Sequence, residues 1–453
     1  MKEIIIVIAQ FLLSISLLVV LHEMGHFLMA KLFKTKVEKF YLFFNPKFSL
    51  FKKQIGETEY GIGWLPLGGY VKIAGMIDES MDKEFLNTEP KPWEFRSKPA
   101  WQRLLIMLGG IMVNLILAVI IYIMIAWTWG DKKIPLDSLH DGLWIPHPVL
   151  QDIGFRTGDR IIALDGKSVK YLDDLIGAPN VPLITASQAT VVRGSDTLDI
   201  NIPKDLPKRL IENKQKTGLI NLRYPFVVGK VMPDSPNKEA GLQKGDRIVA
   251  VDGKPVKYMD QVMDYLHNHK GNDITITINR NGQNIDKKVH VNDQGKLGVQ
   301  LASLPLDELE KEGFLRIEYN RYGFFDGIGK GLHRAWNTLS SYIDQLKMIF
   351  NPSTGAYKGV GGFMSIAKIF PKTWNWLAFW EITAFLSIML AVLNLLPIPA
   401  LDGGHAMFTL YEMITGRKPG EKFLEKAQIV GFVILLTLLI LANGADIVRL
   451  FGK

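Results

Sequence analysis

The sequence of 453 residues contains no cysteine. This absence excludes disulfide bonds, zinc sites with thiolate ligands and a cysteine nucleophile, so any metal must be held by histidine, aspartate or glutamate. The sequence also lacks the signatures of nucleic-acid-binding folds, and its lysines and arginines are spread along the chain. We therefore expect no nucleic-acid partner and assign the net charge of +8 to basic loops beside a membrane.

Long apolar runs are present instead. Hydrophobic residues make up 48% of the chain, and four stretches reach the length of about 20 residues that a helix needs to cross a bilayer. They span residues 4–29, 104–127, 374–396 and 427–448. The first has no clear small-residue cleavage site, so we expect it to be retained and not removed as a signal peptide. The fold class is a polytopic α-helical membrane protein in contact with lipid.

Basic loops set the expected orientation of these spans, because lysine and arginine collect on the cytoplasmic side. The loop between spans one and two carries Lys31, Lys34, Lys36, Lys39, Lys47, Lys52, Lys53, Arg96, Lys98 and Arg103. The loop between spans three and four carries Arg417, Lys418, Lys422 and Lys426. Both loops are therefore expected in the cytoplasm, with the two termini and the long central region outside.

The central region contains an internal repeat. The segment GFRTGDRIIALDGKSV from Gly154 matches GLQKGDRIVAVDGKPV from Gly241, an offset of 87 residues. Short Ile/Val-rich strands with Asp-Gly turns are typical of β-rich units, and the pattern resembles the PDZ domain. Residues Gly218, Leu219 and Ile220 suit the carboxylate-binding strand of the second copy. The two copies either bind extended peptides at a sheet edge or serve as spacers or lids.

Residues 323–350 are predicted to form an amphipathic helix. Apolar residues recur there at helical spacing, namely Phe325, Ile328, Leu332, Trp336, Leu339, Ile343 and Leu346. Such a helix either lies on the membrane surface or packs on a PDZ-like unit. We favour the membrane, because Trp374, Trp376 and Trp380 begin the next span as an interfacial belt.

The sequence His22-Glu23-Met24-Gly25-His26 lies in the first span. On a helix, positions i and i+4 lie on one face, so both imidazoles reach the same metal while Glu23 projects beside them to take a proton from water. Ionisable groups in a membrane helix cost roughly 2.5–3.5 kcal/mol each, which indicates a functional reason for this cluster.

Two histidines do not complete a catalytic zinc site, which usually has three protein ligands. Residues 394–405, NLLPIPALDGGH, follow the third span at the cytoplasmic end, where prolines stop the helix and two glycines allow close approach. Asp402 is the favoured third ligand. His405, one turn further on, is the alternative, either as the ligand or as a group supporting it.

The HExxH motif in a first membrane helix, LDG after a later one and tandem PDZ-like copies between them resemble the site-2 protease family of intramembrane zinc metalloproteases (M50). The segment 61–70, GIGWLPLGGY, and Gly110 and Asn114 in the second span also resemble family motifs. The resemblance covers nearly the whole chain.

The resemblance implies that His22, His26 and Asp402 bind Zn²⁺, that Glu23 activates water and that Asn394 contacts the substrate backbone. Implied substrates are single-span membrane proteins, such as an anti-sigma factor already shortened by a first protease, and remnant signal peptides. It further implies a bacterial inner-membrane location, a role in the sigma-E stress response and a PDZ pair that filters substrates by size.

The first cytoplasmic loop is predicted to form short strands at 37–44, 47–53, 57–63 and 70–74, with turns at Asn45-Pro46 and Gly68-Gly69. A membrane helix must unwind before its carbonyls are open to attack. We hypothesise that an exposed edge of this loop holds the unwound substrate by β-addition.

The expected domains run in nine segments along the chain. These are a first membrane helix with HExxH (1–33), a cytoplasmic membrane-associated β-loop (34–100), a second membrane helix (101–130), a first PDZ-like domain (131–215), a second PDZ-like domain (216–305), an amphipathic helix and linker (306–372), a third membrane helix (373–400), a cytoplasmic loop with LDGGH (401–426) and a fourth membrane helix (427–453).

Two other classes of function remain open from the residues alone. A PDZ-based membrane scaffold would keep all activity in a Glu23→Gln variant. A metal transporter would move metal into vesicles without producing a peptide, since buried histidine and aspartate in spans also mark ion paths.

Overall fold

The computed structural model describes residues 2–65, 68–76, 89–177, 181–213, 218–302 and 304–451. The chain divides into two compact units, which are described separately. The helical unit contains Met1–Gly130, Arg321–Phe350 and Tyr357–Lys453. The β-rich unit contains Asp131–Asn320 and Asn351–Ala356.

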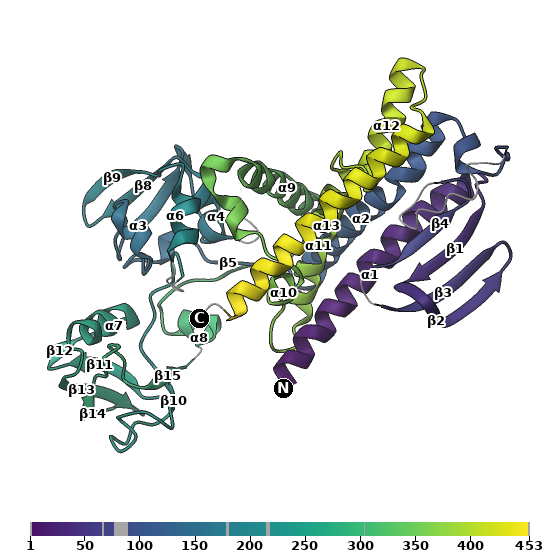
Figure 1. The fold of residues 1–453 in the computed structure, drawn as a ribbon. Coiled ribbons are helices and arrows are strands. Elements are labelled where there is room, and N and C mark those ends of the chain that lie inside the picture. Colours follow the sequence, from purple (N-terminus) through teal and green to yellow (C-terminus); the bar gives the residue numbers. More distant parts are fainter. Residues whose placement is uncertain are drawn as a thin grey trace. The chain divides into compact units, whose positions relative to one another are not determined.

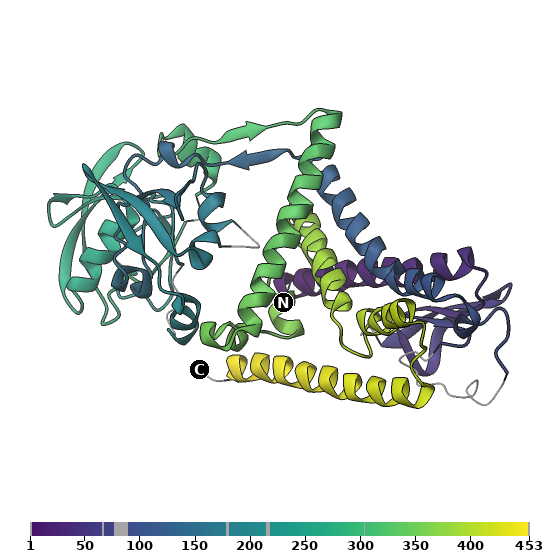
Figure 2. The ribbon, with the colours of Figure 1, turned by 90° about the horizontal axis from the view of Figure 1, so that it is seen from above.

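Four helices of the helical unit are long and apolar enough to cross a membrane (Figures 1 and 2). They are α1 (Lys2–Leu32), α2 (Ala100–Thr128), α11 (Trp376–Leu395) and α13 (Glu421–Phe451). Each contains one of the four predicted spans or matches it to within two residues, so four helices of the length and apolar composition of a span lie where they were predicted.

Helix α2 packs against both α1 and α11. Glycines permit the closest approach: a Cβ atom added to Gly25 of α1 would overlap the backbone of Gly109 in α2, and the reverse also holds. Small residues are the usual means by which membrane helices approach closely. This contact brings the face of α1 that carries the two histidines against α2.

Helix α9 (Phe324–Phe350) confirms the predicted amphipathic helix. Its buried residues are mostly small, and Gly327 and Gly331 lie against Trp127 and Ile123 of α2. The large apolar side chains are exposed instead, among them Phe325 and Trp336. The helix therefore packs on a membrane helix through its small residues and leaves its large apolar residues uncovered within this unit.

A four-stranded sheet lies against the C-terminal half of α1 (Figure 2). Its strands are β1 (Val37–Leu42), β2 (Phe44–Ile55), β3 (Thr58–Leu65) and β4 (Tyr70–Ile73), in the order β2-β3-β1-β4. β1 runs parallel to β3 and antiparallel to β4. All four predicted strands are present. β4 is an edge strand of the sheet and contacts α1.

One predicted turn in this sheet is wrong. Asn45 and Pro46 were expected to separate two strands, but both residues lie inside β2. Phe43 between β1 and β2 and Lys47 within β2 both adopt left-handed backbone conformations, with φ of 66° and 74°. An irregular register between Phe44 and Ser49 accommodates the proline in the edge strand.

The helical unit also contains two further helices, α10 (Phe363–Ala367) and α12 (Asp402–Thr415). Two short 3₁₀ helices are η2 (Phe95–Ser97) and η5 (Ala356–Gly359), and the first residue of η5 belongs to the β-rich unit. Arg103 of α2 pairs with Glu412 of α12 at 2.5 Å, with both side chains mostly buried. This ion pair fixes α12 to the start of α2.

The β-rich unit contains two sheets with the same strand order. The first repeat has β7-β6-β8-β9 and the second has β12-β11-β13-β14. The strands of the first are β6 (Arg160–Leu164), β7 (Lys167–Ser168), β8 (Gln188–Arg193) and β9 (Asp196–Asn201). Those of the second are β11 (Arg247–Val251), β12 (Lys254–Pro255), β13 (Asp273–Arg280) and β14 (Gln283–His290).

Contacts recur in the two repeats with the sequence offset of 87. Arg193 binds Asp159 through two hydrogen bonds of 2.7 and 2.8 Å, and Arg280 binds Asp246 with the same two distances. The same guanidinium groups also donate to the carbonyl oxygens of Gly154 and Gly241. The repeated sequence therefore produces a repeated fold.

The remaining elements of the β-rich unit connect and cover these sheets. They are β5 (Asp131–Lys133), η3 (Leu136–Ser138), α3 (Pro148–Asp152), α4 (Asp173–Ile176), α5 (Pro182–Thr185), α6 (Leu206–Glu212), β10 (Val228–Val231), α7 (Met259–Asn268), β15 (Val299–Leu301), α8 (Leu306–Lys311), β16 (Glu318–Asn320) and η4 (Pro352–Thr354).

The boundary between the two repeats differs from the expected one. Ile220 is buried in the hydrophobic core of the first repeat, and Leu309 from beyond the second repeat joins the same core. Asn221 exchanges two backbone hydrogen bonds with Trp144, of 2.8 and 2.9 Å, much as β15 pairs with β10 in the second repeat. Gly218 to Ile220 therefore lead into an isolated β-bridge of the first repeat, and their prediction as the carboxylate-binding strand of the second is wrong.

Candidate zinc and active site

His22 and His26 lie one turn apart on α1, on the face that meets α2. Their side chains are 7% and 5% exposed, and their Nε2 atoms are 3.3 Å apart. Gly110 of α2 lies directly against both imidazole rings, and its lack of a side chain leaves space for them. A Cβ atom at position 110 would lie 2.5 Å from His26 Nε2 and 2.6 Å from His22 Cε1.

Asp402 reaches the two histidines from the other end of the sequence. Its Oδ2 atom lies 3.1 Å from His22 Nε2 and 3.3 Å from His26 Nε2. Helix α11 ends at Leu395, and the chain turns back so that α12 begins at Asp402. Gly403 and Gly404 pack directly on the backbone of residues 395–399, which leaves no room for a Cβ atom.

The three atoms form a group suited to a cation. The Nδ1 atom of His26 lies 2.8 Å from the carbonyl oxygen of Ile106, which can only accept, so Nδ1 carries a proton and the neutral imidazole has its lone pair on Nε2. Asp402 Oδ2 is buried without a hydrogen-bond partner among the described residues. In this form of His26, the lone pairs of Nε2 and Asp402 Oδ2 face each other at 3.3 Å, an arrangement that a positive ion between them stabilises.

The spacing also suits zinc. Ligand atoms at tetrahedral angles, each bonded to zinc at roughly 2.0–2.1 Å, stand about 3.3–3.4 Å apart. The observed separations of 3.1, 3.3 and 3.3 Å are close to this value. Two imidazoles and one carboxylate are a ligand set known for catalytic zinc, with the fourth position left for water or substrate.

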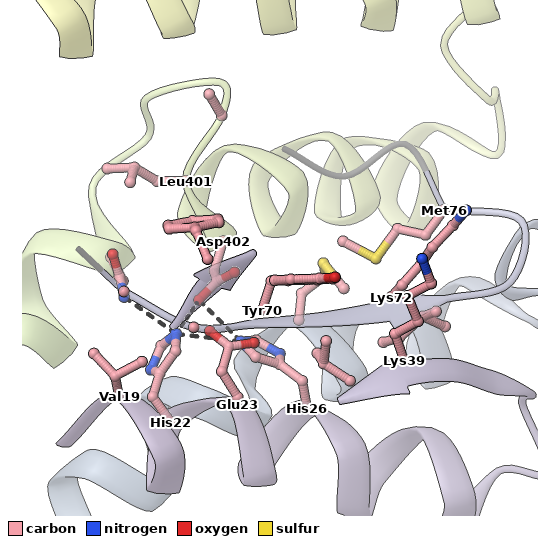
Figure 3. A pocket seen from close by; sticks show the side chains of 18 of the residues that line it. Val19, His22, Glu23, His26, Lys39, Tyr70, Lys72, Met76, Leu401 and Asp402 are labelled. Atoms are coloured by element: carbon pink, nitrogen blue, oxygen red, sulfur yellow. Dashed lines mark hydrogen bonds and ion pairs between the residues drawn. The ribbon is translucent and has the colours of Figure 1, made fainter. Parts of the chain in front are cut away.

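A cavity of about 900 Å³ opens on this group (Figure 3). Glu23 lies beside the two imidazoles at its wall, and Asn394 at the end of α11 places Nδ2 3.2 Å from His22 Nε2. His405 also lines the cavity but is not part of the three-ligand group. The structure thus brings together all five predicted site residues and leaves the alternative ligand outside the cluster.

A second wall of the cavity comes from the first cytoplasmic loop, whose exposed edge was expected to hold substrate although the sequence did not indicate which strand. All four residues of β4, the edge strand of the sheet, line it, as does Lys39 of β1. On the opposite side it is lined by Leu401 and by Gln428 of α13. A strand edge therefore runs along the cavity that contains the metal-ligating group.

A buried cluster of two histidines and a carboxylate, with a further carboxylate on an open cavity among membrane helices, defines the class of zinc metalloproteases that act at a membrane. The sequence profile of Peptidase family M50 matches residues 10–438. The chain belongs to this family, which confirms the resemblance to the site-2 proteases, and it is a zinc-dependent metalloprotease.

Curated relatives match over nearly their full length. A zinc metalloprotease of Neisseria meningitidis is 29% identical over 98% of this chain and 99% of its own. The regulator of sigma-E protease RseP of Salmonella typhimurium is 27% identical, with 98% of each chain covered. Among solved structures, the PDZ domain of an SdrC-like protein from Listeria monocytogenes is similar to 19% of this chain over 90% of its own, with 25% identity and a TM-score of 0.16.

Proposed function

We propose that His22, His26 and Asp402 hold the catalytic zinc and that Glu23 is the general base. The observation that carries this proposal is the triangle of ligand atoms with sides of 3.1 to 3.3 Å, in which Asp402 Oδ2 has no hydrogen-bond partner within the described chain. Asp402 is preferred to His405 because only Asp402 contacts both imidazoles.

A zinc ion held by these three residues would supply Lewis-acid chemistry, which polarises a carbonyl group and brings the pKa of water to about 7. The carboxylate of Glu23, beside the imidazoles, takes the proton from the attacking water and delivers it to the leaving amine. Asn394 has an amide that both donates and accepts, which suits contact with the backbone of a peptide at the scissile bond.

The substrate is proposed to be the membrane span of a single-span protein, bound as an extended strand. Strand β4 is an edge of the sheet and lines the cavity beside the proposed ligands. An extended segment added to this edge would pass over His22, Glu23 and His26 with its amides hydrogen-bonded.

A proline in β4 tests this role. The N–H of Ala74 bonds to Lys36 of the sheet, so the alternation along the strand points the N–H of Val71 away from β1. Val71→Pro is expected to slow cleavage at least tenfold while zinc binding is kept. Lys52→Pro, on the opposite edge strand β2, is the matched control. Equal cleavage by the two folded variants would contradict β-addition at β4.

The wider role is proposed from the relatives and the repeats. The name of the Salmonella relative, regulator of sigma-E protease, supports a role in sigma-E regulation. The proposed substrates are an anti-sigma factor already shortened by a first protease and remnant signal peptides. We propose that both β repeats are PDZ domains that exclude substrates with bulky outer domains. The basic loops support a bacterial inner-membrane location with the site near the cytoplasmic face and the repeats and both termini in the periplasm.

The decisive experiment is cleavage of a tagged single-span substrate in detergent by the wild type and by Glu23→Gln, with and without a chelator. We expect the variant to bind zinc and to lose activity by a factor of about 10²–10⁴, the usual contribution of a general base. The chelator is expected to abolish cleavage by the wild type. Equal cleavage in all samples would contradict the proposal and favour a scaffold or a transporter.

A further inference from the structure

Asn114 contacts the proposed metal site from α2. Its side chain is fully buried, and its Nδ2 atom is placed 3.2 Å from Nδ1 of His22, the imidazole nitrogen opposite the proposed zinc ligand. Its backbone oxygen accepts a hydrogen bond of 2.7 Å from Ser387 of α11. The side chain is therefore held at the junction of three membrane helices, and its amide faces an imidazole.

The two atoms of this amide are unequally satisfied. Asn114 Oδ1 is buried and has no hydrogen-bond partner in the part of the chain that the structure describes. An amide with its nitrogen toward Nδ1 requires the lone pair of a neutral His22 on Nδ1, and so the tautomer with the proton on Nε2. That tautomer cannot bind a metal through Nε2, because the lone pair is used by the proton.

Zinc binding reverses the requirement. When Nε2 of His22 is a ligand, the proton sits on Nδ1 and needs an acceptor. Rotation of the Asn114 amide by half a turn places Oδ1 against Nδ1 in nearly the same volume. Asparagine suits both states, since its side chain contains a donor and an acceptor of similar shape.

His26 differs in this respect. Its Nδ1 atom faces the backbone oxygen of Ile106, which accepts in every state. Ile106, Gly110 and Asn114 are spaced by four residues, so one face of α2 supplies the acceptor for His26, the space for both rings and the amide for His22. Only the contact to His22 depends on a side chain.

We propose that Asn114 is a positioning residue that accepts a hydrogen bond from Nδ1 of His22 in the zinc-bound enzyme, and so selects the tautomer in which Nε2 binds the metal. This inference rests on the proposed function, because it requires His22 to be a ligand. Partners of this kind typically change metal affinity by roughly 10–100-fold when they are removed.

The test is zinc affinity, measured by chelator competition on the purified full-length protein in detergent. Asn114→Leu, which keeps the branched shape but has no acceptor, is expected to bind zinc about 10–100-fold more weakly. Asn114→Ala, which adds no bulk, is expected to behave alike if the leucine variant does not fold. Asn114→Asp retains an acceptor and is expected to stay within about threefold of the wild type.

Ser387→Ala is the matched control, because it removes a hydrogen bond to the backbone of the same residue and leaves the amide in place. It is expected to leave zinc affinity unchanged. Unchanged affinity in Asn114→Leu or Asn114→Ala would overturn the inference, and so would equal losses in these variants and Ser387→Ala, or a tenfold loss in Asn114→Asp.

His22→Ala separates this inference from the proposed function. If His22→Ala loses zinc and the Asn114 variants do not, only the role of Asn114 is wrong. If His22→Ala keeps full zinc affinity, the proposed metal site itself is wrong. In the cobalt-substituted protein, Asn114→Leu is also expected to shift the visible spectrum, whereas Ser387→Ala is not.

Discussion

The β repeats and the histidine cluster of the helical unit both bury charged side chains, but they do so in different ways. In each β repeat, a buried aspartate is paired with an arginine through two hydrogen bonds, and the guanidinium also binds a backbone oxygen. In the helical unit, Asp402 meets two imidazoles and one of its oxygens has no hydrogen-bond partner among the described residues.

The difference separates structural from functional charge. A buried pair whose charges and hydrogen-bonding groups are matched needs no further ligand, although removal of one partner destabilises the fold. The metal-binding atoms of the histidine cluster point at one another, an arrangement that a bound cation stabilises. Breaking the two kinds of cluster should therefore have different consequences.

The largest effect is expected at the metal cluster. Asp402→Ala should lose zinc and reduce proteolysis by more than about 10³-fold, because two histidines alone do not form a stable catalytic site. Metal content and cleavage of a single-span substrate measure this. His405→Ala is the matched variant and should keep its zinc. Loss of zinc in His405→Ala but not in Asp402→Ala would exchange the two assignments.

A smaller loss is expected where only space is changed. Gly110→Ala places a methyl group 2.5 Å from His26 Nε2, so the imidazoles must move apart. Zinc affinity should fall by about 10²-fold, a shift of the size caused by other changes around metal ligands. Gly444→Ala in α13, where an added Cβ meets nothing within 4 Å, is the control. Equal zinc affinity in these variants would contradict the close packing of α2 on the site.

Breaking an ion pair of the β repeats should change stability and leave the chemistry intact. Asp246→Ala is expected to lower the free energy of unfolding of the second repeat by about 2–3 kcal/mol, since Arg280 loses its partner. Asp286→Ala, on the exposed strand β14, should change it by less than about 0.5 kcal/mol. Hydrogen exchange of β13 in the full-length protein measures this stability. A loss of zinc in Asp246→Ala would contradict the separation of the two clusters.

The smallest effect concerns pH. Burial raises the pKa of Asp246, but the hydrogen bonds and charge of Arg280 outweigh it, and the net pKa is lowered. The corresponding stabilisation is complete above the unfolded-state pKa of about 3.9 and is lost as the pH falls through the lower folded-state value. Asp246→Asn should therefore lack this part of the acid sensitivity of the second repeat. An acid-unfolding curve identical to that of the wild type would contradict it.

The sequence predicted the features that depend on local pattern. The four spans follow from apolar runs, the relation of His22 to His26 from helical spacing, and the recurrence of the β repeat from its offset of 87 residues. Asp402 was predicted because the run of prolines and glycines at 397–404 ends a span at the same side of the membrane. Its contact with both imidazoles required the structure.

Features that depend on pairing between distant segments were not predictable. The core residue Ile220 belongs to the first repeat because its neighbour Asn221 pairs with Trp144, a long-range choice that local propensity does not contain. The packing of α9 on α2 through Gly327 and Gly331 was not predictable from the apolar pattern, since small residues allow closer helix packing. The contact of Asn114 with His22 likewise follows from the packing of α1 on α2.

The central claim is that two imidazoles and one carboxylate hold the zinc. X-ray absorption at the zinc edge on the purified protein measures this most directly. The account predicts zinc bound by two imidazole nitrogens at roughly 2.0–2.1 Å, with oxygen ligands completing the shell. His22→Ala should then show at most one imidazole. A wild-type protein without specifically bound zinc, or a spectrum that is unchanged in His22→Ala, would contradict the account.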